Sequence, residues 1–263
     1  MTVRILTSSR AGFLSGRFSF SGRGRGSIMW RSFFVFLILF LVLAQPVFAW
    51  YYFTTNAGAR MRWVFSSSCN SASQISPIFD SDIPTSARAN VIPAILTEWN
   101  NAAGVTLYGS ASYSVSMSAS VANSFINSPV AGQLWVVWDT DGSVLRSLGV
   151  DPTGSILGVG LPLTMDASRP ADICAAILVL NASTSFLPNS VATCTVAGTC
   201  QTFEFTLLHE MGHTLGFAHA ISGRNGTAFT TAVANLPVMY PFAHSTNTLA
   251  PDEIAGAKAV YGN

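Results

Sequence analysis

His209-Glu210-Met211-Gly212-His213-Thr214-Leu215-Gly216-Phe217-Ala218-His219 is the most informative stretch of this 263-residue sequence, since it holds three of the chain's four histidines. On a helix, His209 and His213 project from one face, because residues four apart lie on neighbouring turns. Two imidazole nitrogens at that spacing can reach one metal ion at about 2.0–2.1 Å. Gly216 follows one turn later and, lacking a Cβ, can adopt the positive φ that ends a helix. The chain can then turn and bring His219 to the same ion as a third ligand.

Three histidine ligands leave one coordination position open for water, which distinguishes a catalytic zinc site from a structural one. Glu210 then serves as a general base that accepts a proton from that water and returns it to a leaving amine. The motif fixes five identities within eleven positions, and its chance occurrence in such a chain is on the order of 10⁻⁵. The alternative is that the three histidines are packed core residues. The fourth, His244, lies beyond the motif and is expected to be a surface loop residue.

The pattern H-E-x-x-H-x-x-G-x-x-H resembles the zinc signature of the metzincin peptidases. That family has a methionine turn downstream, and Leu236-Pro237-Val238-Met239-Tyr240-Pro241 is similar to it. The resemblance implies that Met239 forms an apolar floor beneath the zinc ligands. The Met-Tyr-Pro version and the closing stretch 249–262 look like the matrixin branch. The implied fold is an α+β, zincin-like domain with a mixed twisted sheet, an active-site helix and a C-terminal helix.

The resemblance to matrixins extends upstream to residues 139–142 and 156–162, which look like the segment leading to the edge strand over the cleft. It implies that an extended peptide substrate pairs with that strand through backbone hydrogen bonds. The segment after Met239 is expected to wall the pocket for the side chain that follows the cut, with Tyr240 structural rather than a zinc ligand. The residues expected to contact substrate are Gly158, Val159, Gly160, Leu161, Tyr240, Pro241 and Phe242.

Several features depart from the matrixin pattern. Ala220 follows the third zinc ligand where matrixins usually have serine, and no histidines remain for the family's structural zinc, so that second site is expected to be absent. Cys69 does not lie in a cysteine-switch motif, so latency through a cysteine-bearing propeptide is not expected. Asp139 and Asp141 could bind Ca²⁺, but two carboxylates beside a glycine more often form a turn, and calcium prefers six to eight oxygens.

The first 49 residues are predicted to be a leader. They hold six arginines and no acid, giving +6, whereas residues 50–263 hold seven bases and twelve acids, giving 7 − 12 = −5. An apolar core over residues 33–43 is followed by Gln-Pro and by Val-Phe-Ala49, the order typical of a secretory signal cleaved after Ala49. A membrane anchor is the alternative, but about 11–13 apolar residues are too few to span a bilayer. Met29 is the expected translation start, with residues 1–28 a dispensable extension.

Residues 50–263 are predicted to form a single exported domain, secreted or periplasmic and monomeric. Lys258 is its one lysine, and a mildly acidic body offers no electrostatic footprint for nucleic acid. An even number of cysteines in an exported chain favours disulfides. Cys194 and Cys200 flank a short loop that a bridge could close, leaving Cys69 with Cys174, although four cysteines allow three pairings. A thiolate metal site is the alternative, weakened by the lack of a C-x-x-C pair.

Hydrophobic periodicity predicts strands in the first half of the domain and helices that flank them, which favours the α+β class. The predicted strands span residues 60–65, 105–117, 134–138, 156–161 and 173–180. The predicted helices span residues 87–104, 202–217 and 251–261.

Together these patterns predict a secreted zinc-dependent endopeptidase that acts on protein or peptide substrates. One alternative is a secreted zinc-binding or adhesion-type module that keeps the metzincin fold without turnover. Another is a peptidase of a different metzincin branch. A peptidase assay with and without a chelator separates enzyme from binding module.

Overall fold

Strand β8 (Ala175–Asn181) lies inside the main sheet, and all seven of its residues are buried. It pairs in parallel with β5 (Gln133–Asp139) and antiparallel with β6 (Gly158–Leu163). A strand that is covered on both faces and paired at both edges is expected to be apolar throughout. This arrangement explains the near-continuous apolar run in the sequence.

The computed structural model describes residues 51–65, 69, 73–219, 237–241 and 247–262. The predicted leader, its start at Met29 and its cleavage after Ala49 lie outside these residues, as do Ala220, Phe242 and His244. Among the described residues, no helix combines the length and apolar character needed to cross a bilayer.

The sheet continues beyond β5 with β3 (Ser76–Asp80) and β4 (Ser112–Val115), each parallel to its neighbour. The strand order is β4-β3-β5-β8-β6. Strand β6 therefore forms one edge of the sheet and runs against the other four strands. The expected α+β class with a mixed sheet is confirmed.

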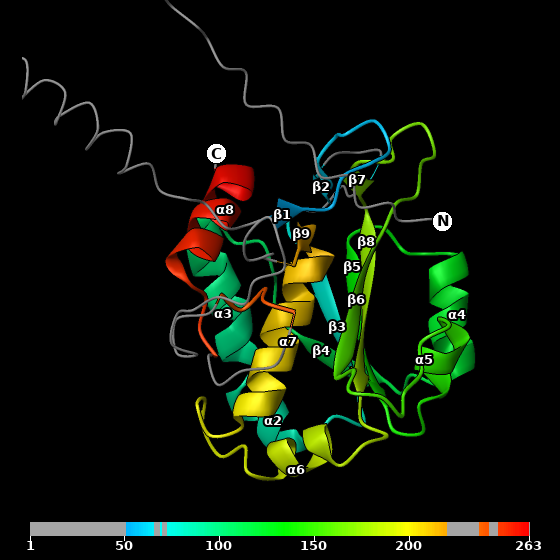
Figure 1. The fold of residues 1–263 in the computed structure, drawn as a ribbon, viewed down its shortest axis with the longest axis vertical. Coiled ribbons are helices and arrows are strands. Elements are labelled where there is room, and N and C mark those ends of the chain that lie inside the picture. The colour runs from blue at the N-terminus through cyan, green and yellow to red at the C-terminus, as the bar shows by residue number, and fades with distance from the viewer. Residues whose placement is uncertain (1–50, 66–68, 70–72, 220–236, 242–246, 263) are drawn as a thin grey trace, which may run out of the picture. The chain divides into compact units, whose positions relative to one another are not determined.

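Helices cover both faces of the sheet (Figure 1). One face is covered by α3 (Ile92–Ala103), α7 (Gln201–Thr214) and α8 (Pro251–Tyr261), and the other by α4 (Ala119–Asn127) and α5 (Ser143–Ser147). The short helices α2 (Thr85–Asn90) and α6 (Phe186–Ala192) lie together near one end of α7 in the same view. The core on the α7 side contains Trp99, Phe203 and Phe217, whereas the core on the other side contains Phe125 and Val144.

Two small sheets lie outside the main one. Strand β1 (Tyr51–Tyr52) pairs antiparallel with β9 (Phe217–Ala218), and β2 (Arg62–Trp63) pairs in parallel with β7 (Asp172–Ile173). Both therefore connect the beginning of the described chain to segments more than a hundred residues later. In this way the first described residues are fixed beside the end of α7.

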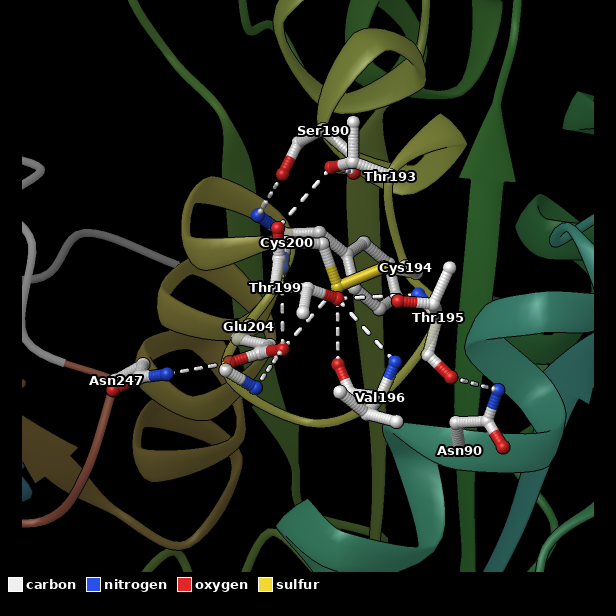
Figure 2. Close-up of a disulfide and its surroundings, with 12 residues drawn as sticks. Asn90, Ser190, Thr193, Cys194, Thr195, Val196, Thr199, Cys200, Glu204 and Asn247 are labelled. Atoms are coloured by element: carbon white, nitrogen blue, oxygen red, sulfur yellow. Dashed lines mark hydrogen bonds between the residues drawn. A yellow bond between two sulfur atoms is a disulfide. The ribbon is translucent and has the colours of Figure 1, made fainter.

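Helix α7 begins directly after a disulfide between Cys194 and Cys200. Inside the first turn, the buried Glu204 accepts hydrogen bonds from the Gly198 backbone N–H at 2.7 Å and from Asn247 Nδ2 at 2.6 Å (Figure 2). A carboxylate near a helix N-terminus also opposes the positive end of the helix dipole. These contacts fix where α7 starts.

The cysteine pairing suggested by the sequence is confirmed. Cys69 is bonded to Cys174 at a sequence separation of 105, and Cys194 to Cys200 at a separation of 6. All four cysteines are buried. Disulfides persist in oxidising compartments, so the structure agrees with an extracellular or similarly oxidising environment.

The predicted strand over residues 105–117 is wrong in its extent. The chain pairs with the β3 region at a single bridge between Ile75 and Tyr108, and then again at β4, where the register shifts. Gly109 and Ser110 separate the two pieces. A glycine adds no side chain to the sheet and weakens a strand, which the alternation of apolar residues does not reveal.

The predicted helix boundaries also change. The helix expected over residues 87–104 is divided into α2 and α3 near Val91, because Pro93 in the first turn of α3 has no N–H to continue the hydrogen-bond chain. The helix expected over 202–217 ends at Thr214, and Gly216 adopts a φ of +93°, the role predicted for it. The strand expected over 60–65 is reduced to β2. Strand β3 and helices α4, α5 and α6 were not predicted.

The two disulfides are expected to differ in their contribution to stability. In the loop-entropy account, a bridge that closes a loop of about 100 residues stabilises by about 4.7 kcal/mol, and a loop below about 15 residues by less than about 3 kcal/mol. Replacing both Cys69 and Cys174 by alanine should therefore lower the free energy of unfolding more than the matched C194A/C200A pair does. Urea unfolding of both double variants measures this difference. Equal losses would contradict the loop-length argument.

Candidate metal centre

His209 and His213 lie one turn apart on α7, and both are buried, at 6% and 8% exposure. His209 Nδ1 donates to the carbonyl of Val238 at 2.6 Å, and His213 Nδ1 donates to the carbonyl of Phe217 at 2.8 Å. A carbonyl only accepts hydrogen bonds, so each Nδ1 carries the ring proton. When such a ring is neutral, its lone pair is therefore at Nε2, the state in which histidine binds a metal.

His219 completes the cluster. Its Nε2 lies 3.2 Å from Nε2 of His209 and 3.1 Å from Nε2 of His213. Two nitrogens bound at 2.0–2.1 Å to one tetrahedral ion are about 3.3 Å apart, close to the observed separations. These are the only His, Cys, Asp or Glu side chains among the described residues that group in this way.

The short distances between the Nε2 atoms also indicate that the cluster favours a bound cation. Nε2 of His209 and Nε2 of His213 have no proton to donate, and Nε2 of His219 carries at most one. At least one of the two contacts therefore brings two lone pairs together, which is unfavourable without a positive charge between them. A cation bound by the three nitrogens removes this repulsion. The residues present thus fit a metal ion.

Burial favours the neutral rings. It lowers the pKa of His213 well below its usual value, and the neighbouring His209 adds to this effect. Burial also lowers the pKa of His219, which is more exposed than the other two. Neutral imidazoles near pH 7 can bind a metal without first losing a proton.

Glu210 lies next to His209 in sequence but outside the histidine cluster. Its side chain is 7% exposed and packs against strand β6, where a Cβ added to Gly158 would lie 2.8 Å from Glu210 Cγ. Burial raises its pKa to about 8, and the Gly160 backbone N–H partly opposes this rise. A cation at the nearby histidines would favour the ionised form. The carboxyl group is thus placed to exchange protons near neutral pH.

Two glycines allow β6 to approach α7. A Cβ at Gly160 would lie 2.3 Å from the backbone oxygen of Glu210 and 2.9 Å from His213 Cβ, and one at Gly158 would lie 3.1 Å from Thr206 Cγ2. Such distances leave no room for a larger residue. The sequence pattern Gly-x-Gly in this strand is therefore explained by contact with the helix that carries the histidines.

The hydrogen-bond register shows which groups of β6 are open. The Leu157 carbonyl accepts from the Asn181 N–H, so alternate residues from 157 onward pair with β8. Val159 and Leu161 therefore direct their backbone groups to β8, and their side chains pack in the core on the α4 side. The backbone groups of Gly158 and Gly160 point away from β8, and the Gly160 N–H there bonds the Glu210 carboxyl group, which leaves the two carbonyls open. Of the four residues expected here, the two glycines have the geometry to meet an extended peptide.

Met239 lies beneath α7 and is 1% exposed. Its Sδ would be 2.3 Å from a Cβ added to Gly212, next to the ligand His213. The adjacent Val238 carbonyl is the partner of His209. The short segment 237–241 therefore contacts α7 directly, with Tyr240 partly buried and Pro241 exposed.

Glu253 is a buried residue of this site that the sequence analysis missed. Its carboxyl group accepts the Met239 N–H at 2.5 Å and the Ala250 N–H at 2.8 Å. It thereby ties the start of α8 to the turn that supports His209. A Glu in the third position of a helix commonly reaches back to the residue before the helix, so its position in Pro-Asp-Glu was the available signal.

The aspartates considered for calcium have other partners. Asp139 Oδ2 accepts the Leu145 N–H at 2.9 Å, and Asp141 Oδ1 accepts the Ser143 N–H at 2.8 Å. Both carboxylates therefore bind backbone groups at the start of α5, as expected of a turn.

No protein family model matches this chain, and no curated protein matches it.

Replacing Gly160 by alanine is expected to destabilise the fold. The added methyl group would overlap the Glu210 backbone oxygen, and overpacking of this kind typically costs about 1–3 kcal/mol. Gly154→Ala is the matched control, because its Cβ would meet the nearest atom at an ordinary 3.7 Å. Urea unfolding should show a clear loss for G160A and a change within about 0.5 kcal/mol for G154A. Equal stability of the two variants would contradict the close contact.

Glu253 is expected to make stability depend on pH. Burial raises its pKa from 4.5 to about 7, so the folded chain binds more protons than the unfolded chain between these values. The free energy of unfolding therefore falls as pH rises through this window, by about 3 kcal/mol. Glu253→Gln lacks this titration. The free energy of unfolding is measured for both proteins with a chelator at pH 4.5, 6 and 7.5. As the pH rises, that of the wild type should fall relative to that of E253Q. Parallel profiles would show that Glu253 ionises equally in both states.

Proposed function

We propose that this chain is an exported zinc-dependent endopeptidase with a metzincin-type catalytic domain. The observation that carries the proposal is the cluster of His209, His213 and His219, whose Nε2 atoms are 3.1 and 3.2 Å apart, beside a buried glutamate. A set of three histidines matches catalytic zinc better than structural zinc, because structural sites use four protein ligands. The two disulfides support export.

The architecture around the cluster supports the metzincin-type domain. A mixed sheet ends in an antiparallel edge strand, and the helix carrying the first two histidines packs against that strand. A turn containing a buried methionine lies against the same helix, and a final helix closes the chain. These are the parts that the resemblance in the sequence implies, in the same order.

Glu210 supplies the proton transfer in this proposal. His209, His213 and His219 would hold the Zn²⁺ ion, which would supply a Lewis acid for a peptide carbonyl and for a water molecule. Glu210 accepts a proton from the attacking water and delivers it to the amine nitrogen as the peptide bond breaks. A carboxyl group with a pKa of about 8 before metal binding is close enough to neutrality to act in both directions.

The edge of β6 supplies the binding surface for substrate. The carbonyls of Gly158 and Gly160 point away from β8 and can accept hydrogen bonds from an extended peptide. Pro162 lacks an N–H, which suits an edge strand and limits pairing with other chains. Tyr240 and Pro241 are proposed to wall the pocket for the residue after the cut. An extended, locally unfolded protein segment is therefore the substrate class.

Replacing Glu210 by glutamine tests the proposal directly. The wild type should bind one Zn²⁺ per chain and hydrolyse casein or a quenched fluorescent peptide, with activity lost on chelation and restored by Zn²⁺. E210Q should retain zinc but lose about 10²- to 10⁴-fold in rate. Zinc content is measured by elemental analysis and rate by fluorescence.

Glu204→Gln is the matched control, because Glu204 is a second buried carboxylate on the same helix, away from the histidines. It should keep most of the peptidase activity at temperatures well below its unfolding midpoint. Hydrolysis by E210Q at the wild-type rate would refute the role of the base. Zinc binding without any hydrolysis by the wild type would instead indicate a binding module.

A further inference from the structure

The turn between the second and third histidines is held from outside by the first residues of the described chain. Strand β1 pairs with β9, which contains the two residues immediately before His219. Directly after β1, the Phe53 N–H donates to the Gly216 carbonyl at 2.7 Å. Residues 51–53 thus lie alongside residues 216–218, which connect α7 to His219.

Two side chains from other parts of the chain donate hydrogen bonds to the last carbonyls of α7. The indole Nε1 of Trp63 donates to the Thr214 carbonyl at 2.8 Å, and the Tyr261 hydroxyl donates to the Leu215 carbonyl at 2.7 Å. The Tyr261 hydroxyl in turn accepts from the Trp63 N–H at 3.3 Å. Carbonyls at the end of a helix have no partner within the helix, so the turn depends on these outside donors.

Side chains reinforce the backbone pairing. The Phe53 ring lies 5.5 Å from the His213 ring, and the Tyr52 ring lies 5.0 Å from the Phe217 ring. Gly216 also packs closely on Met61, because a Cβ added to Gly216 would lie 2.4 Å from the Met61 backbone oxygen. Phe53 therefore contacts both the turn, through its backbone, and the second ligand, through its ring.

We propose that Phe53, together with strand β1, is a positioning element of the metal centre. Strand β9 has two residues and pairs, among the described strands, with β1 alone. Loss of that pairing would leave His219 at the end of a turn with a missing hydrogen bond. Metal affinity therefore depends on the integrity of residues 51–53, and cleavage of the chain there would weaken the site. This inference rests on the proposed zinc function.

Phe53→Pro in the full chain removes the N–H that the Gly216 carbonyl accepts. Asn56→Pro is the matched control, because Asn56 is the first inner residue of the turn that the Gly58 N–H closes onto the Thr55 carbonyl, a position that suits proline. Zinc affinity is measured by competition with a chromophoric chelator. F53P should bind Zn²⁺ about 10-fold more weakly than wild type, the lower end of the effect of losing a direct partner of a metal ligand, because Phe53 acts on His219 through the turn. N56P should bind as wild type does.

The visible absorption of bound Co²⁺ gives a second readout, which reports the ligand set rather than general stability. F53P should lose the intense bands of a four-coordinate site, and N56P should keep them. If F53P does not fold, F53L keeps the backbone bond but loses the ring contact, so its affinity should fall several-fold, with F53Y restoring it.

The outcomes separate the two proposals. A wild-type protein without histidine-dependent zinc binding overturns the proposed function and this inference with it. Zinc binding and peptidase activity in the wild type, with unchanged affinity and Co²⁺ spectrum in folded F53P, overturn only the positioning role. Where F53L replaces F53P, unchanged affinity has the same meaning. Equal losses in N56P would also overturn it, because the effect would then not be specific to the bond with Gly216.

Discussion

Three imidazole nitrogens that face one another at 3.1 and 3.2 Å are the constraint around which this domain is arranged. Two of the rings are held in a single tautomer by backbone carbonyls, so they cannot turn away or donate to each other. The carbonyls belong to Val238 and Phe217, one on the methionine turn and one on strand β9. Two surrounding elements therefore orient the histidine cluster through one hydrogen bond each.

These supports come from opposite ends of the chain. Glu253 on the last helix holds the turn that orients His209, and the segment beginning at Tyr51 holds the strand before His219. The disulfide at Cys200 and the carboxylate of Glu204 fix the start of α7. The result is a rigid helix with separate anchors at its beginning, its end and its flank. Of these contacts, those that reach the histidine rings directly are the kind that tune a metal site.

The sequence predicted the parts of the structure that depend on local spacing. The i, i+4 histidines, the glycine that ends α7, the buried strand β8 and the pairing of the cysteines were all readable from residue type and distance along the chain. Apart from the Cys69–Cys174 pair, it gave little information on contacts between distant segments. The role of Phe53 depends on pairing across more than 160 residues, and that of Gly160 on the path of a neighbouring helix. Periodicity carries no information about either.

Every residue of α7 from Phe203 to Thr214 is buried. A helix without a solvent face is ordered by the surrounding apolar core, so His209 and His213 are positioned by packing. The domain therefore differs from small zinc modules, in which ion capture drives folding. A metal ion held by the three histidines would therefore meet a site whose shape is set by the apolar core around α7.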